Sequence, residues 1–209
     1  MRNVTLALFS AIILGATSFF SVAQAAAGSE QASKYVESLG NRAIAIIANE
    51  KLPKVQKQKQ LEKIFADNVD IPWVGRFVMG RFWRTATPEQ QKRYLKEYET
   101  FVITHYASRF AEYSGGKFTI TSTRKDSENE FTVSMKMETG DQGAEPVAVD
   151  YRVRSNAGSM KVFDVIVEGV SMITTQRAEF NAILNDKGID TLIDKLASKS
   201  LSAEVAAKK

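Results

Sequence analysis

The sequence predicts an α+β fold: a single domain with a curved four-stranded antiparallel sheet and with N- and C-terminal helices packed on one of its faces. Two observations lead to this prediction. The middle of the chain contains four short segments in which apolar and polar residues alternate, with polar turns between them. The segments before and after repeat apolar residues every three or four positions, which is the helical period. The length, 209 residues, suits one such domain.

The first helical segment is expected over residues 29–49, and Pro53 separates it from a lysine-rich helix with one buried face. A third helical stretch is expected over residues 67–84. Asp70 fits its N-cap, and Gly80 fits a bend or an end.

The strongest helix start is Thr87-Pro88-Glu89-Gln90, where Thr87 and Gln90 can form a capping box. This helix should run to about Tyr113, and Gly115 and Gly116 should stop it.

The four alternating segments are the expected strands of an antiparallel meander with one face in the core. They cover residues 117–124, 130–137, 146–153 and 159–167. Helical periodicity returns after Gly169, with Gly188 as a plausible C-cap before a last short helix. Residues 26–199 are therefore expected to form the domain, and residues 200–209 a flexible tail.

The start of the chain has the pattern of an export signal. Arg2 precedes an apolar run from Leu6 to Val22, and Ala23-Gln24-Ala25 is a small-x-small cleavage pattern. We expect residues 1–25 to be a signal peptide cut near Ala25, with Ala27 as a second register. A membrane anchor is the alternative, but the run is short for a spanning helix. In a bacterium with two membranes the destination is the periplasm.

The amino-acid composition excludes several kinds of functional site. The chain has one His and no Cys, which excludes disulfides, thiol nucleophiles and multi-histidine metal sites. Its 28 Lys and Arg residues against 24 Asp and Glu residues make it mildly basic, but the basic residues are spread along helices with acids nearby. This pattern does not favour nucleic-acid binding. No cofactor is expected either, because the glycines match no phosphate-binding loop.

Two polar residues stand in apolar surroundings. His105 lies at helical spacing among aromatic residues, where a structural role is the ordinary interpretation and catalysis the alternative. Asp164 interrupts an apolar strand, so it should be paired or point to solvent. Arg177 is its possible partner. A structural ion pair, a polar contact at a cavity mouth and a general base all stay open for Asp164.

The clearest feature is an excess of aromatic residues. The chain has 12 Phe, 6 Tyr and 2 Trp, and all but Phe9, Phe19 and Phe20 follow the predicted signal peptide. Many lie on one face of a helix or strand. The residues alone allow either a large core or an apolar cavity between the helices and the concave sheet, and periodicity favours the core.

Three motifs resemble one known family. Residues 80–91, GRFWRTATPEQQ, are similar to the "G-x-x-W-x-x-A-T-x-x-Q" stretch of the MlaC-type, or toluene-tolerance, phospholipid-binding proteins. Residues 161–172, KVFDVIVEGVSM, resemble that family's "K-V-x-D-V-x-V-E-G-V-S" signature. Residues 177–180, RAEF, resemble its "R-x-x-F", with GID-x-LI following from Gly188. The resemblance covers about residues 29–199; Met160 departs from it, where the family often has Trp.

The resemblance implies a nuclear-transport-factor-like fold that encloses an apolar cavity, and no enzymatic step. It implies a periplasmic carrier that holds phospholipid acyl chains. Such a carrier shuttles lipid between an outer-membrane lipoprotein complex and an inner-membrane ABC transporter with an MCE-domain ring. A hopanoid or another lipid is the alternative cargo.

The expected site combines residues of strands and helices, each of which also has a plain core interpretation. The expected lipid-binding residues are Trp73, Phe77, Phe101, Val102, Tyr106, Phe110, Val133, Met135, Val149, Tyr151, Phe163, Val165, Val170 and Ile173. Asp164 and Arg177 are expected at the pocket mouth or as a structural pair. The protein is expected to be monomeric. The lysine-rich helix is either a solvated face or a docking face for an acidic partner or anionic head groups.

Two other classes of function stay open. One is an enzyme of the same fold that uses Asp164 and His105 in an apolar cavity. The other is a ligand-free periplasmic scaffold or chaperone with a filled core.

Overall fold

We describe the fold from a computed structural model of the full chain. The description covers residues 17–112, 117–138, 145–156, 158–198 and 200–201, without the side chains of residues 17–26 and 108–112. The expected stop at Gly115 and Gly116, most of the expected tail and the first part of the expected signal peptide lie outside these residues.

The elements follow the predicted order of helices, strands and helix. The helices are α1 (Thr17–Ala48), α2 (Lys54–Asn68), α3 (Ile71–Met79), the short 3-10 helix η1 (Gly80–Arg84), α4 (Pro88–Glu112) and α5 (Met172–Ala197). The strands are β1 (Phe118–Lys125), β2 (Glu130–Met137), β3 (Val147–Asn156), β4 (Ser159–Val167) and β5 (Val170–Ser171).

The sheet is an antiparallel meander in the order β1-β2-β3-β4-β5. This confirms the α+β class and the four predicted strands, and adds the two-residue strand β5. The chain turns back at Glu168 and Gly169, which both have positive φ angles, 48° and 79°. A strand of two residues is too short to show an alternating pattern, so the sequence carried no signal for β5.

Local capping explains where several helices begin and end. The Asp70 side chain accepts from the backbone N–H of Trp73 at 3.3 Å. Thr87 and Gln90 form the predicted capping box, with reciprocal bonds of 3.1 and 3.2 Å. Gly80 ends α3 with a φ of 59°. Gly188 breaks α5 with a φ of 78°, and so separates the two helical segments that the sequence predicted there.

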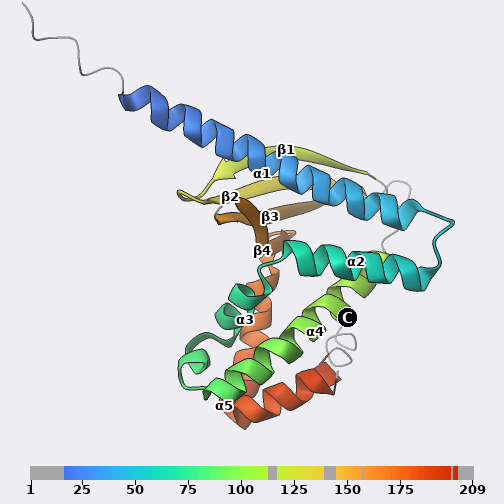
Figure 1. The fold of residues 1–209 in the computed structure, drawn as a ribbon, viewed down its shortest axis with the longest axis vertical. Helices are drawn as coiled ribbons and strands as arrows, with labels where there is room; N and C mark the ends of the chain where they lie inside the picture. Colours follow the sequence, from blue (N-terminus) through green and yellow to red (C-terminus); the bar gives the residue numbers. More distant parts are fainter. Residues whose placement is uncertain (1–16, 113–116, 139–144, 157, 199, 202–209) are drawn as a thin grey trace, which may run out of the picture.

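The helices divide into two groups around the sheet (Figure 1). Helix α1 lies along the sheet and contacts β1 and β2, whereas α3 and α5 contact β4 and pack with α4. Two hydrophobic clusters result. We call the first the α1–sheet layer; it lies between α1 and the apolar side chains of β1 to β4. We call the second the helical cluster; it is built by α3, α4 and α5.

Candidate functional site

The expected lipid-binding residues fall into both clusters. Those in the α1–sheet layer are Val133, Met135, Val149, Tyr151 and Val165. Those in the helical cluster are Trp73, Phe77, Phe101, Val102, Tyr106, Phe163 and Ile173. Val170 is 52% exposed, and the Phe110 side chain lies outside the described residues. The expected residues therefore belong to two hydrophobic clusters, which share Val69 at their border, and their role in lipid binding stays a prediction.

Strand alternation explains which side chains face α1, and a β-bulge explains why Phe163 lies on the other face. Val133 faces Tyr151 across the β2–β3 pair, and Tyr151 faces Val165 across the β3–β4 pair, so the three share one face. The register then shifts, because Arg152 pairs with Asp164 while Val153 pairs with Val162. Phe163 is the extra residue. It turns away from the layer and packs edge-on against Trp73, with ring centroids 5.4 Å apart.

Two glycines let α1 approach the sheet closely. A Cβ on Gly28 would lie 2.7 Å from the ring of Phe131, and a Cβ on Gly40 would lie 2.7 Å from the ring of Phe118. Between these points Ala32 and Val36 are fully or almost fully buried. Nine described residues of the layer are buried, with exposed fractions of 8% or less.

The border of the layer is apolar and only half-buried. The half-buried hydrophobic residues that pack against it are Tyr35, Leu39, Val69, Phe118, Ile120, Met137, Val147, Tyr151 and Val165. Helix α1 contacts β1 and β2, and α2 contacts β4, so displacing α1 would expose the apolar face of β1 and β2.

Polar contacts fasten α1 to α2. The Tyr35 hydroxyl donates to the backbone and side-chain oxygens of Asn68, both at 3.2 Å, and Arg42 donates to the same side chain at 3.4 Å. Burial raises the pKa of Tyr35 to about 12, against a smaller opposing effect of the Arg42 charge. These contacts hold the C-terminal part of α1 beside the helical half of the molecule.

The opposite face of the sheet is polar. Arg124, Thr132, Arg152 and Asp164 form a row across four strands. Burial alone would raise the pKa of the neighbouring Asp126. Hydrogen bonds from Thr132 and Arg124 outweigh that effect and hold the pKa below its ordinary value. Charged and hydrogen-bonded residues make this face unsuitable for acyl chains.

The helical cluster is fixed by hydrogen bonds inside it. The Tyr94 hydroxyl donates to the carbonyl of Gly75 at 2.9 Å, and the Tyr98 hydroxyl donates to Gln176 at 2.5 Å. Burial raises the pKa of both tyrosines well above the ordinary value. The Phe180 ring lies edge-on to Tyr98, with centroids 6.1 Å apart. These satisfied polar groups define one arrangement of the helices.

Two arginines on β3 contact aromatic rings, and one of them, Arg154, joins the sheet to α3. Arg154 donates to Glu130 at 2.7 and 2.9 Å, and its guanidinium lies 4.3 Å from the ring centre of Trp73. Arg152 lies 4.7 Å from the ring centre of Phe163. Sequence reasoning missed both arginines. Both arginines alternate with apolar residues along β3 and therefore lie on the sheet face that also carries Asp164. This alternation was the signal that sequence reasoning could have used.

Asp164 is buried and caps α5. Its carboxylate accepts from the Ser171 hydroxyl at 2.8 Å and from the Ile173 backbone N–H at 3.3 Å. Its ion-pair partner is Arg152, at 3.8 Å, and not Arg177 as the sequence predicted. Arg177 instead lies over the Phe77 ring, 4.9 Å from its centre. The sequence could not show that the β3–β4 register places Arg152 opposite Asp164.

His105 belongs to the aromatic packing of α4. Its ring stacks on Phe101, with centroids 5.3 Å apart, and meets Tyr106 edge-on at 5.2 Å. The described partners of Asp164 lie on β3 and at the start of α5, whereas the described ring contacts of His105 lie on α4. Within the described residues, no group of three or more His, Asp and Glu could hold a metal ion.

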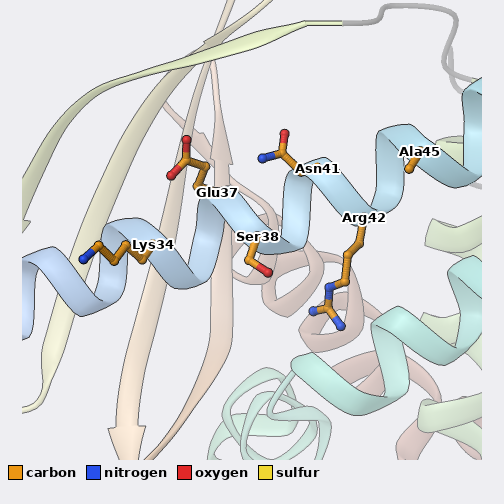
Figure 2. A pocket seen from close by; sticks show the side chains of 6 residues that line it. All are labelled: Lys34, Glu37, Ser38, Asn41, Arg42 and Ala45. Carbon is orange, nitrogen blue, oxygen red and sulfur yellow. The ribbon is translucent and has the colours of Figure 1, made fainter.

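A shallow hollow of about 520 Å³ lies on the outer side of α1. Its lining residues are Lys34, Glu37, Ser38, Asn41, Arg42 and Ala45 (Figure 2). Figure 2 shows Glu37 and Asn41 pointing to one side of the helix and Ser38 and Arg42 to the other. The lining residues other than Ala45 are polar or charged, and all six are exposed.

A model of the MlaC protein family matches residues 37–198. The chain belongs to the MlaC family. This family consists of lipid-binding transport proteins, in agreement with the expectation that the chain is not an enzyme. No helix among the described residues of this MlaC-family chain is long and apolar enough to cross a membrane.

Several known proteins resemble this MlaC-family chain. The intermembrane phospholipid transport system binding protein MlaC of Haemophilus influenzae is 28% identical over 130 residues, which are 61% of this chain and 61% of that protein. The toluene tolerance protein ttg2D of Pseudomonas putida is 29% identical over 150 residues, covering 70% and 69%.

A solved structure shares the fold. It is the phospholipid-binding protein of Ralstonia solanacearum in complex with a phospholipid, with a TM-score of 0.69 and 23% identity over 83% of this chain and 98% of that one.

The motifs that carry the family resemblance have structural roles in this chain. Gly80 lies against the Arg177 guanidinium, where a Cβ would come within 3.2 Å of a nitrogen. Gln91 donates to the carbonyl of Trp83 at 2.8 Å. These contacts join η1 to α4 and α5, and the Asp164 cap joins β4 to α5. The motifs therefore identify the fold more directly than they identify the lipid site.

Proposed function

We propose that the protein is a phospholipid carrier that holds acyl chains between α1 and the apolar face of the sheet. The observation that carries this proposal is the α1–sheet layer, in which apolar side chains of β1 to β4 converge under a single helix with a half-buried apolar border. The names of the Haemophilus and Ralstonia proteins, which describe phospholipid transport and phospholipid binding, support the same cargo.

Such a carrier must shield the acyl chains of its lipid from water. A chain of about 16 carbons costs on the order of 13 kcal/mol when it is exposed to water, at about 0.8 kcal/mol per CH₂. The acyl chains must therefore replace contacts inside the layer, and α1 must move away from the sheet to admit them. Because the head group can stay in water, few specific polar contacts are needed. The apolar cavity is part of this proposal.

The carrier would work in the periplasm after export and cleavage near Ala25. Helix α1 runs through this point without a break, from Thr17 to Ala48. Gly28, which lies against Phe131, follows the cut. Cleavage would thus leave the described packing of the layer intact. The proposed partners are an outer-membrane lipoprotein complex and an inner-membrane MCE-domain ABC transporter, between which the monomeric carrier shuttles.

Native mass spectrometry of the protein purified without detergent tests the cargo. We expect a bound mass that matches a diacyl phospholipid. A hopanoid mass would keep the carrier role and change the cargo; Met160, which is buried in the layer, is the position where such a difference could arise. A protein that stays empty after incubation with vesicles would contradict the proposal and favour a ligand-free scaffold.

A matched pair of variants tests the location. Val165 and Ile183 are both half-buried hydrophobic residues, the first at the border of the layer and the second at the border of the helical cluster. We expect Val165→Asp to lose most of its bound lipid and Ile183→Asp to retain it. Circular dichroism checks that both variants fold. Loss of lipid in Ile183→Asp alone would place the chains in the helical cluster instead.

A further inference from the structure

The turn between α1 and α2 carries a group of exposed residues with no assigned role. We call Lys51, Lys54, Val55 and Lys59 the basic corner. Figure 1 shows this turn at the right-hand edge of the molecule, beyond the end of α1 and away from α5. Pro53 lies in the turn, immediately before α2.

The lysines of this region divide into two kinds. Lys57 donates to the backbone carbonyl of Ile47 at 2.6 Å, and Lys63 pairs with Asp67 at 2.8 Å. Lys51, Lys54 and Lys59 are exposed, and the ion pairs between described residues include none of them. Three cationic side chains of the corner are therefore available to a partner.

An apolar side chain lies among these lysines. Val55 is 65% exposed, the highest value among the large hydrophobic residues that the structure describes. Lys59 follows it by one helical turn, so the two share a face of α2. An exposed apolar side chain bordered by lysines is the combination that binds at the head-group region of an anionic bilayer.

We propose that the basic corner docks the protein on the surface of an anionic phospholipid bilayer. This inference rests on the proposed carrier function: docking would serve lipid exchange, because the corner follows the end of α1 and α1 covers the α1–sheet layer. Gly40 touches the Phe118 ring, and the eight residues from there to Ala48 span about 12 Å of helix. Docking would thus hold one end of the α1–sheet layer close to the bilayer that supplies or receives lipid.

Flotation with lipid vesicles tests the docking surface. The exported protein is mixed with phosphatidylcholine vesicles that contain or lack phosphatidylglycerol, at low and at high salt. We expect binding to the anionic vesicles at low salt and its loss at high salt. The triple variant Lys51→Glu, Lys54→Glu and Lys59→Glu should bind at least about tenfold more weakly. Val55→Gln, which keeps every charge, should weaken binding a few-fold.

The matched control reverses three other exposed lysines. Lys92, Lys125 and Lys136 take part in none of the ion pairs between described residues, so Lys92→Glu, Lys125→Glu and Lys136→Glu change the net charge equally. We expect this variant to bind vesicles within a factor of about three of the unmodified protein. Equal loss in both triple variants would overturn the proposal, since total charge would then explain the binding.

Absence of vesicle binding by the unmodified protein at low salt would also overturn the proposal, and would leave an acidic protein face as the partner of the corner. Native mass spectrometry of the same samples separates this result from the carrier function. A protein that carries phospholipid but does not bind vesicles contradicts only the docking surface. A protein that binds vesicles but is never loaded contradicts only the carrier function.

Discussion

The two hydrophobic clusters of this protein differ in construction. The helical cluster contains buried hydroxyl groups whose hydrogen bonds, from Tyr94 to Gly75 and from Tyr98 to Gln176, admit one arrangement. The α1–sheet layer is closed largely by apolar contact with α1, and its polar fastening is at Asn68, next to the Val69–Val162 bridge to β4. Fixed hydrogen bonds suit a scaffold, whereas apolar contact can be exchanged for acyl chains, although moving α1 would also separate Tyr35 and Arg42 from Asn68.

The largest expected difference comes from truncating one side chain in each cluster. Phe180 is 1% exposed and Val133 is fully buried. We expect Phe180→Ala to lower the free energy of unfolding by about 3–5 kcal/mol and to leave lipid bound to the folded protein. Val133→Ala should cost less, about 2 kcal/mol, and should change the amount or type of bound lipid. Chemical denaturation and native mass spectrometry measure the two quantities. If Phe180→Ala folds but loses its lipid, the helical cluster would also bind lipid, which would contradict the assignment of lipid binding to the α1–sheet layer.

The next effect concerns the junction of the clusters. Asp164→Ala removes the acceptor for Ser171 and Ile173 and the partner of Arg152. We expect a loss of about 2–3 kcal/mol, at the low end for a buried pair because Arg152 is 34% exposed on its side chain. Lipid transfer between vesicles should persist at temperatures where the variant is folded. If transfer stops while the fold and the bound lipid are retained, Asp164 has a role in lipid transfer as well as in stability.

A smaller effect separates the two ends of the layer. At Gly28 an added Cβ meets the ring of Phe131, which is 3% exposed, and at Gly40 it meets the ring of Phe118, which is half-buried. Alanine favours helix by about 1 kcal/mol over glycine. We expect Gly28→Ala to destabilise by about 1 kcal/mol because Phe131 cannot move, and Gly40→Ala to be neutral or stabilising. Thermal melts of both variants make the comparison, and a reversed order would show that the Gly40 end is the rigid one.

The smallest effect is expected at alkaline pH. Burial raises the pKa values of Tyr94 and Tyr98 well above 10, and that of Tyr35 to about 12. The folded state therefore holds these protons more tightly than the unfolded state. Their contribution to stability is fully present below about pH 10 and is lost as pH rises through the folded-state values. Melting temperature should fall above pH 10, and Tyr94→Phe should reduce that fall. A flat profile would contradict the burial of these hydroxyl groups.

Much of the fold could be predicted from local patterns. Alternation located four strands, and capping residues such as Asp70, Thr87 and Gly188 located helix ends, because these signals act over a few residues. The lipid-binding residues stay a prediction, and their division between two clusters could not be seen in the sequence. Val133, Met135 and Val149 share a face by alternation, but nothing local shows that Phe163 leaves that face at a bulge.

The sequence by itself determined the α+β class, the order of the elements, the export signal as a prediction and the resemblance that the MlaC family model confirms. The tertiary structure decided that the apolar residues form two clusters, that α1 contacts β1 and β2 while α3 and α5 contact β4, and that Asp164 pairs with Arg152. The physical reason is distance along the chain. Periodicity and capping are set by neighbouring residues, whereas the pairing of strands and the choice of covering helix depend on contacts between residues far apart in sequence.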